Sequence, residues 1–71
     1  MNPAPIWRQP DGAPIACREK LRVLAENHAE LAIVMQDAFE DAVLMGVDPE
    51  LARQAISDLV ARLRMPGQGA E

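Results

Sequence analysis

The sequence predicts an all-α fold, in which one long helix and one short helix form a hairpin. Between Leu21 and Met45 apolar residues recur at alternating steps of three and four, which is the spacing of one face of a helix. The pattern stops at residues 46–49, where glycine and proline mark a turn. Trp7 and Phe39 are the only Phe, Trp or Tyr residues, so a core must be built from aliphatic side chains, which suit helix packing better than a sheet.

The N-terminal arm, residues 1–14, contains four prolines. Such a composition predicts extended or disordered chain and not helix. Trp7 leaves two alternatives open: a flexible tail, or an arm that folds back over the exposed part of the long helix, because an indole gains much from burial. Residues 15–65 are predicted to form the helical hairpin domain, and residues 66–71 a frayed tail.

The long helix is predicted to run from Ile15 or Ala16 to Met45. Gly46 then supplies the left-handed position that ends many helices. Val47 follows it, in place for the hydrophobic contact that often accompanies such an end.

The short helix is predicted to run from Pro49 to about Arg64. Asp48 has a side chain that is preferred at an N-cap, and proline fits the first helical position. The Met-Pro-Gly sequence that follows Arg64 stops the helix. The predicted buried face of this helix consists of Leu51, Ala55, Ile56, Leu59, Val60 and Leu63.

The residues that recur at this spacing form one stripe along the long helix, apolar except for His28, and it is longer than the short helix can cover: Leu21, Leu24, His28, Leu31, Met35, Ala38, Ala42 and Met45. A chain of 71 residues buries only about 60% of its unfolded surface, and a single cysteine makes no intrachain disulfide. Oligomerisation is the remaining source of stability. The sequence therefore predicts a homodimer, in which two hairpins pack as a four-helix bundle. The predicted dimer interface consists of Leu21, Leu24, His28, Leu31, Met35, Ala38 and Ala42.

The charges of the long helix predict how two copies pair. Three basic residues lie near its N-terminal end and three acidic residues near its C-terminal end: Arg18, Lys20 and Arg22, and Asp37, Glu40 and Asp41. The helix dipole disfavours both groups, because it is positive at the N-terminal end and negative at the C-terminal end. An antiparallel copy, centred near Leu31, places each basic end beside an acidic end, which sets orientation more than affinity.

Three sets of residues could form a ligand site, a cation site or a reactive thiol, and each also has an interpretation without such a site. His28 could be a ligand or proton switch at a symmetric interface, or a histidine at the edge of the stripe. Asp37, Glu40 and Asp41 could bind a hard cation, or form a solvated acidic face. Cys17, predicted in the first helical turn, could be a reactive thiol or an inert one. Because no ligand set of adequate geometry is visible, we expect no catalysis, no cofactor and no structural metal.

The stretch from Asp41 to Gln54 resembles the Ala-x-x-x-Gly-Val core of the DNA-binding helix-turn-helix family. The resemblance implies that the short helix reads bases through Arg53, Gln54 and Ser57. That family usually has a short first helix and a further supporting helix, and this sequence predicts neither. A small DNA-binding regulator is therefore the alternative function.

Net charge and hydropathy limit the partners and the location. The formal charge of −4 opposes binding to nucleic acid or to an anionic membrane surface. No apolar run approaches the roughly 20 residues of a membrane span, and the N-terminus lacks the order of a signal peptide, so we expect a cytoplasmic setting. The expected function is a non-enzymatic interaction or scaffolding protein that acts as a homodimer, with an unidentified protein as a further partner.

Overall fold

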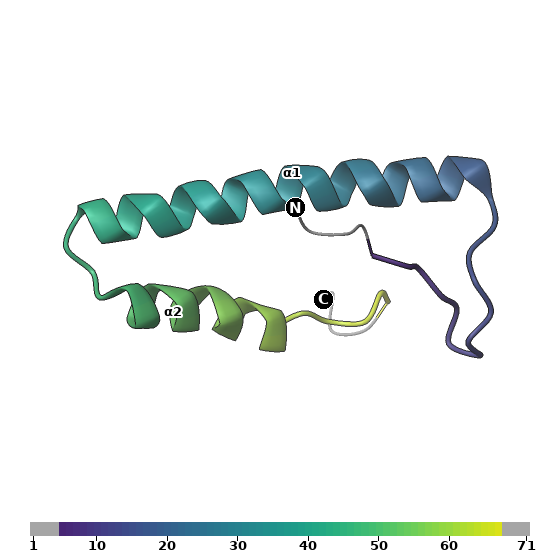
Figure 1. The fold of residues 1–71 in the computed structure, drawn as a ribbon. Coiled ribbons are helices and arrows are strands. Elements are labelled where there is room, and N and C mark those ends of the chain that lie inside the picture. Colours follow the sequence, from purple (N-terminus) through teal and green to yellow (C-terminus); the bar gives the residue numbers. More distant parts are fainter. Residues whose placement is uncertain (1–4, 68–71) are drawn as a thin grey trace. The chain divides into compact units, whose positions relative to one another are not determined.

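The computed structural model describes residues 5–67 and contains two helices, α1 (Arg18–Leu44) and α2 (Pro49–Ala61), joined by a short turn (Figure 1). Within the described range no strand is formed. The predicted all-α helical hairpin is thereby confirmed. Neither of the described helices is long and apolar enough to cross a membrane.

The chain divides into two compact units, Met1–Ile33 and Val34–Glu71, called unit 1 and unit 2 below. Unit 1 holds the arm and the first part of α1, and unit 2 holds the rest of α1, the turn and α2. Residues 1–4 of the arm and residues 68–71 of the predicted tail lie outside the described range.

The arm turns back on itself before α1 begins (purple in Figure 1). The Gln9 amide donates to the Ala13 carbonyl at 2.7 Å, and the Gly12 amide donates to the Gln9 carbonyl at 2.8 Å. Gly12 has a φ of 94°, a left-handed conformation that glycine adopts at low cost. The Ile15 amide then donates to the Trp7 carbonyl at 2.9 Å, which closes the turn.

α1 begins at Arg18, later than the sequence predicts. The backbone N–H of Ile15 already donates to Trp7, so this residue belongs to the turn of the arm and not to the helix. Cys17 takes the N-cap position, because its carbonyl accepts the first helical hydrogen bond, from the Leu21 amide at 2.9 Å.

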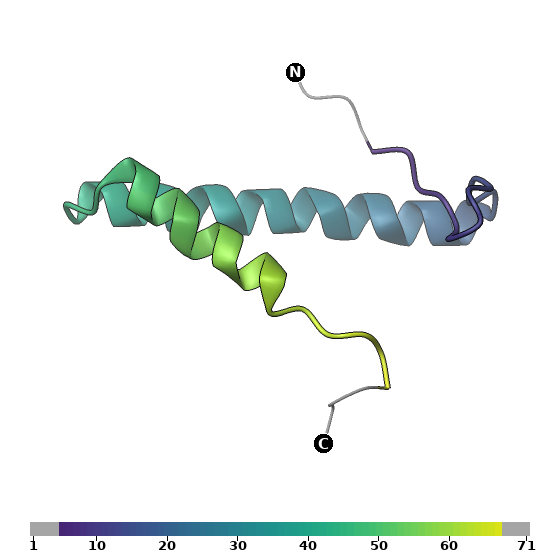
Figure 2. The ribbon, with the colours of Figure 1, turned by 90° about the horizontal axis from the view of Figure 1, so that it is seen from below.

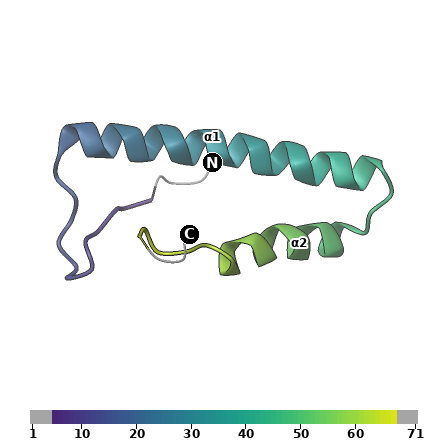
Figure 3. The ribbon, with the colours of Figure 1, turned by 180° about the vertical axis from the view of Figure 1, so that it is seen from behind.

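α1 ends in the glycine turn that the sequence predicts (Figure 3). Gly46 has a φ of 103°, and its amide donates to the Val43 carbonyl at 3.0 Å. The Val47 amide donates to the Ala42 carbonyl at 2.9 Å. These two bonds form a Schellman motif, which satisfies carbonyls that have no partner inside the helix. The helix itself ends one residue earlier than predicted.

Asp48 caps the start of α2, as predicted. Its carboxylate accepts hydrogen bonds from the amides of Glu50, at 3.0 Å, and Leu51, at 3.1 Å. Pro49 occupies the first helical position, where a missing N–H costs nothing. The cap therefore satisfies two amides that the helix leaves open.

The end of α2 differs from the prediction, because the helix stops at Ala61 and not near Arg64. The amides of Arg62 and Leu63 donate to carbonyls three residues back, at 3.1 and 3.2 Å. This bonding tightens the last turn out of α-helical geometry and ends the regular helix.

α2 packs on the part of α1 that belongs to unit 2. Ala52 is 5% exposed, and Phe39, Ala42 and Ile56 are half-buried. The guanidinium of Arg53 lies over the Phe39 ring, 4.9 Å from the ring centroid. These side chains form the small core of unit 2.

The predicted buried face of α2 is wrong in large part. Ala52, which packs most tightly, was not among the predicted residues, and Ile56 is the only predicted one that is even half-buried. The exposed ones are Leu51, Ala55, Leu59, Val60 and Leu63. The apolar residues of α2 span a wider arc than one neighbouring helix can cover. Figure 2 also shows the end of α2 turned away from the α1 segment of the same unit.

Candidate interaction surface

Little apolar surface is buried within the described chain. Ala52 is the only buried residue among residues 5–67, and large apolar side chains are exposed in both units. At the end of α1, Leu44 and Met45 are 84% and 83% exposed. Exposed apolar surface of this extent makes the two helices candidates for contact with a partner.

In unit 1 the predicted dimer stripe is partly covered at its N-terminal end. Leu21 and Leu24 are half-buried, whereas Leu31 is 57% exposed. His28 lies between them along the stripe and is exposed. In the described part of unit 1, the segment that precedes α1 is the only chain outside the helix.

The Trp7 indole lies against His28. The two ring centroids are 6.2 Å apart and the ring planes cross at 79°, an edge-to-face arrangement. Trp7 itself is half-buried. Of the two alternatives that the sequence leaves open for Trp7, the structure shows the one in which the arm folds onto the helix.

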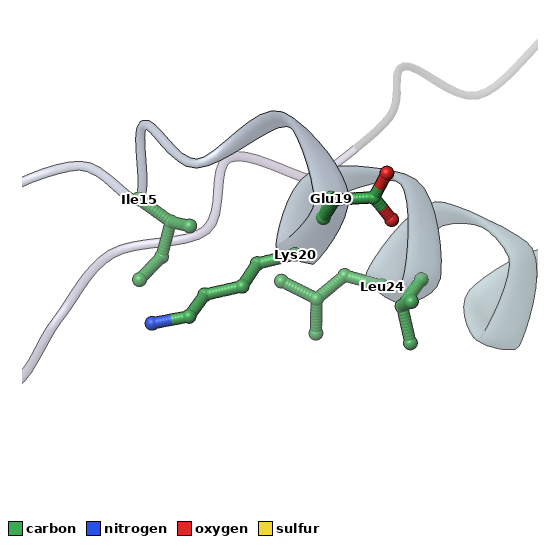
Figure 4. A pocket seen from close by; sticks show the side chains of 5 residues that line it. Ile15, Glu19, Lys20 and Leu24 are labelled. Carbon is green, nitrogen blue, oxygen red and sulfur yellow. The ribbon is translucent and has the colours of Figure 1, made fainter.

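A shallow apolar hollow of about 360 Å³ lies at the start of α1 (Figure 4). It is lined by Ile15, Glu19, Lys20, Val23 and Leu24. In Figure 4 the aliphatic stem of Lys20 runs between Ile15 and Leu24. A long cationic side chain commonly covers apolar surface with its stem in this way. The hollow is therefore an apolar flank of the stripe and offers no polar group for chemistry.

In unit 2 the residues of the stripe differ in exposure. Met35 is 40% exposed and Ala38 is exposed, whereas Ala42 is half-buried in the small core that α2 completes. Met35 and Ala38 are therefore stripe residues of unit 2 that remain exposed to solvent.

Cys17 is an exposed thiol that directly precedes α1, and not a residue of its first turn as predicted. The backbone N–H of Lys20 lowers the pKa of this thiol most, and partial desolvation opposes it. The backbone N–H of Glu19 and the charge of Lys20 lower the pKa further. The net result is a lowered pKa, the usual effect of a helix N-terminus on a neighbouring sulfur.

The acidic residues of α1 do not converge on a cation site. Asp37, Glu40 and Asp41 are all exposed, and the Glu40 carboxylate accepts a hydrogen bond from the Gln36 side chain at 2.8 Å. In the described part of the chain, no group of three or more His, Cys, Asp or Glu side chains is placed to hold a metal ion. The three carboxylates form an acidic face of the helix.

The residues implied by the helix-turn-helix resemblance have partners on α2 itself. Arg53 pairs with Glu50 at 3.0 Å, and its guanidinium lies over an aromatic ring. The Gln54 side chain donates to the Asp58 carboxylate at 2.8 Å, and Ser57 is exposed. Carboxylates beside the proposed reading residues oppose the approach of a phosphate backbone.

Formal side-chain charge is divided unequally between the units. Unit 1 has four basic and four acidic residues, a net charge of zero, whereas unit 2 has three basic and seven acidic residues, a net charge of −4. Near the start of α1, Arg22 pairs with Glu19 at 3.3 Å, and both side chains are exposed. An exposed pair of this kind contributes little to stability.

The chain matches no protein-family model, and it has no significant match among curated proteins or among solved structures. The interpretation of its surface therefore depends on its own residues. Two side-chain contacts in the structure join separate elements: Trp7 with His28, and Arg53 with Phe39.

Proposed function

We propose that this protein is a non-enzymatic helical interaction module that acts as a homodimer. Two copies of α1 pair antiparallel along the stripe, and the two hairpins form a four-helix bundle. The exposed apolar surface of the chain is the observation that carries this proposal.

The amount of exposed surface supports association. On α1, Leu31, Ile33 and Val34 are 57%, 63% and 62% exposed. On α2, Leu51, Leu59 and Val60 are 66%, 56% and 63% exposed. Large apolar side chains of this kind gain free energy when a partner removes them from water. A second copy therefore supplies burial that the single chain lacks.

The centre of the stripe is open to such a copy. Leu31 and Met35 are one helical turn apart on α1 and are 57% and 40% exposed. Ala38, also exposed, follows three residues later on the same face, and its small side chain permits a close approach of a second helix. This central position is where the dyad of an antiparallel pair would lie.

Charge supports the antiparallel orientation. The start of α1 carries three basic residues, and unit 2 has a net charge of −4. Antiparallel pairing brings each basic helix start to the acidic unit of the other copy. Such complementarity steers association and fixes orientation, while apolar burial provides the affinity.

Sedimentation equilibrium at micromolar concentration tests the proposal. We expect twice the 7.8 kDa mass of the single chain. The variant Leu31→Glu should weaken the dimer by at least about 100-fold, because it brings two uncompensated charges to the dyad. A compact, folded wild-type monomer under these conditions would contradict the proposal.

Ile33→Glu is the matched control for this experiment. Ile33 is 63% exposed and lies two residues from Leu31, which places it on the opposite side of α1. Both variants replace an exposed aliphatic side chain of α1 with a carboxylate. They differ in whether the replaced residue lies on the stripe. Equal effects of the two variants would show that the stripe is not the interface.

The remaining expectations about function stay predictions. No contact of α2 favours the DNA-binding alternative. The cytoplasmic setting, the absence of catalysis and a further protein partner likewise rest on the sequence alone.

A further inference from the structure

We propose that the arm covers part of the dimer stripe in the free chain and that a second copy displaces it. This inference rests on the homodimer proposed above and concerns how its formation is regulated. The covering residue is Trp7, which occupies a position at His28 that the second α1 requires.

The arm covers α1 through one side chain. Of its two bulky apolar residues, Trp7 is half-buried and Ile6 is 74% exposed. The Trp7 ring lies 6.2 Å from the ring of His28. Leu21 and Leu24, earlier on the same stripe, are half-buried as well. The N-terminal part of the stripe is therefore the part already covered by the chain itself.

The indole and a second helix cannot occupy this part of the stripe together. Packed helices lie about 8–10 Å apart, axis to axis, and the space between them holds only their own interlocking side chains. The Trp7 ring fills that space at His28. Pairing along the full stripe therefore requires the indole to leave.

The arm can separate from α1 while the hydrogen bonds of its own turn remain. The bonds that close its turn join Gln9 to Ala13 and Ile15 to Trp7, all within the arm and the residue that follows it. Trp7 meets α1 at an exposed histidine. Displacement therefore removes the contact with α1 and leaves the turn intact.

The variant Trp7→Ala tests the inference in the full chain. If part of the binding free energy is spent on displacing the arm, removal of the indole should lower the dimer Kd by about fivefold or more in sedimentation equilibrium. Ile6→Ala, a neighbouring and exposed position, should leave the Kd unchanged. An unchanged Kd for Trp7→Ala would overturn the inference, and so would a higher one, because the indole would then belong to the interface.

Fluorescence of the wild-type chain provides a second test that needs no variant. Trp7 is the only tryptophan, so its emission reports the arm alone. As the concentration rises through the dimer Kd, we expect the emission to shift to longer wavelength, because the indole moves from a half-buried to a solvated position. A constant emission or a shift to shorter wavelength would overturn the inference.

The two proposals fail in different ways. If the wild-type chain dimerises but Trp7 emission does not respond, only the covering role of the arm is lost. If the wild-type chain and Trp7→Ala are both monomeric at every concentration, the homodimer itself is lost, and the covering role with it.

Discussion

At the start of α1, the Cys17 thiol faces the backbone amides of Lys20 and Glu19, which stabilise its thiolate. Its pKa is therefore lower in the folded chain than in the unfolded chain. The resulting stability is fully present above the pKa of the thiol in the unfolded chain. It is lost as the pH falls through the lowered folded pKa.

We expect this difference to appear against Cys17→Ser, because serine keeps a neutral N-cap acceptor. Relative to this variant, the free energy of unfolding of the wild type, measured in urea, should rise with pH across that window. The comparison cancels the titration of other groups. A difference that does not depend on pH would contradict the role assigned to the Cys17 sulfur.

Single residues also show what the sequence can and cannot predict about the site. The stripe residues were predicted from spacing alone. Leu21, Leu24 and Ala42 are half-buried in the described chain, and the others are exposed. The contact between Trp7 and His28 was one of two open alternatives, because it depends on the path of the arm. That path also depends on a hydrogen bond between residues eight apart, from the Ile15 amide to the Trp7 carbonyl, which the composition of the arm does not reveal.

At the scale of the elements, the turn between α1 and α2 was predictable because its chemistry is local. Gly46 adopts the left-handed conformation and Asp48 caps α2, and each residue type is strongly preferred at its position. The packing face of α2 was not predictable in the same way. The apolar residues of α2 lie on more than one side of the helix. Which of them becomes buried, here Ala52, depends on how closely α1 packs against α2.

The variant Asp48→Ala tests the importance of the cap. It removes the acceptor for the amides of Glu50 and Leu51, so we expect a loss of about 1 kcal/mol in the free energy of unfolding. Urea denaturation followed by circular dichroism, at fixed protein concentration, measures this loss.

Asp37→Ala is the matched control for the cap. It removes the same charge from an exposed position in the C-terminal half of α1, where a negative charge opposes the helix dipole. It should leave stability unchanged or raise it slightly. A loss equal to that of Asp48→Ala would show that charge, and not capping, explains the effect.

For the molecule as a whole, the sequence predicted more burial than the described chain achieves. Leu59, Val60 and Leu63 were expected on the buried face of the short helix, yet they are exposed in the described chain. A single short helix provides too little surface to cover two apolar arcs at once. This shortfall is the physical argument for the proposed homodimer, in which one chain would complete the core of the other.

The orientation of the two copies is the central claim, and paired cysteines test it. In an antiparallel pair centred on Leu31, position 24 of one chain lies beside position 38 of the other. Two positions 24 lie roughly 20 Å apart, given a rise of about 1.5 Å per residue. A disulfide forms only when the two Cα atoms are within about 7 Å.

The most direct measurement is oxidative crosslinking of Leu24→Cys with Ala38→Cys, in full chains that also carry Cys17→Ala. Both positions belong to α1 and to the stripe. We expect covalent dimers from a mixture of the two variants, and none from Leu24→Cys alone. Crosslinking of Leu24→Cys to itself, without crosslinking between positions 24 and 38, would establish a parallel pair and contradict the account.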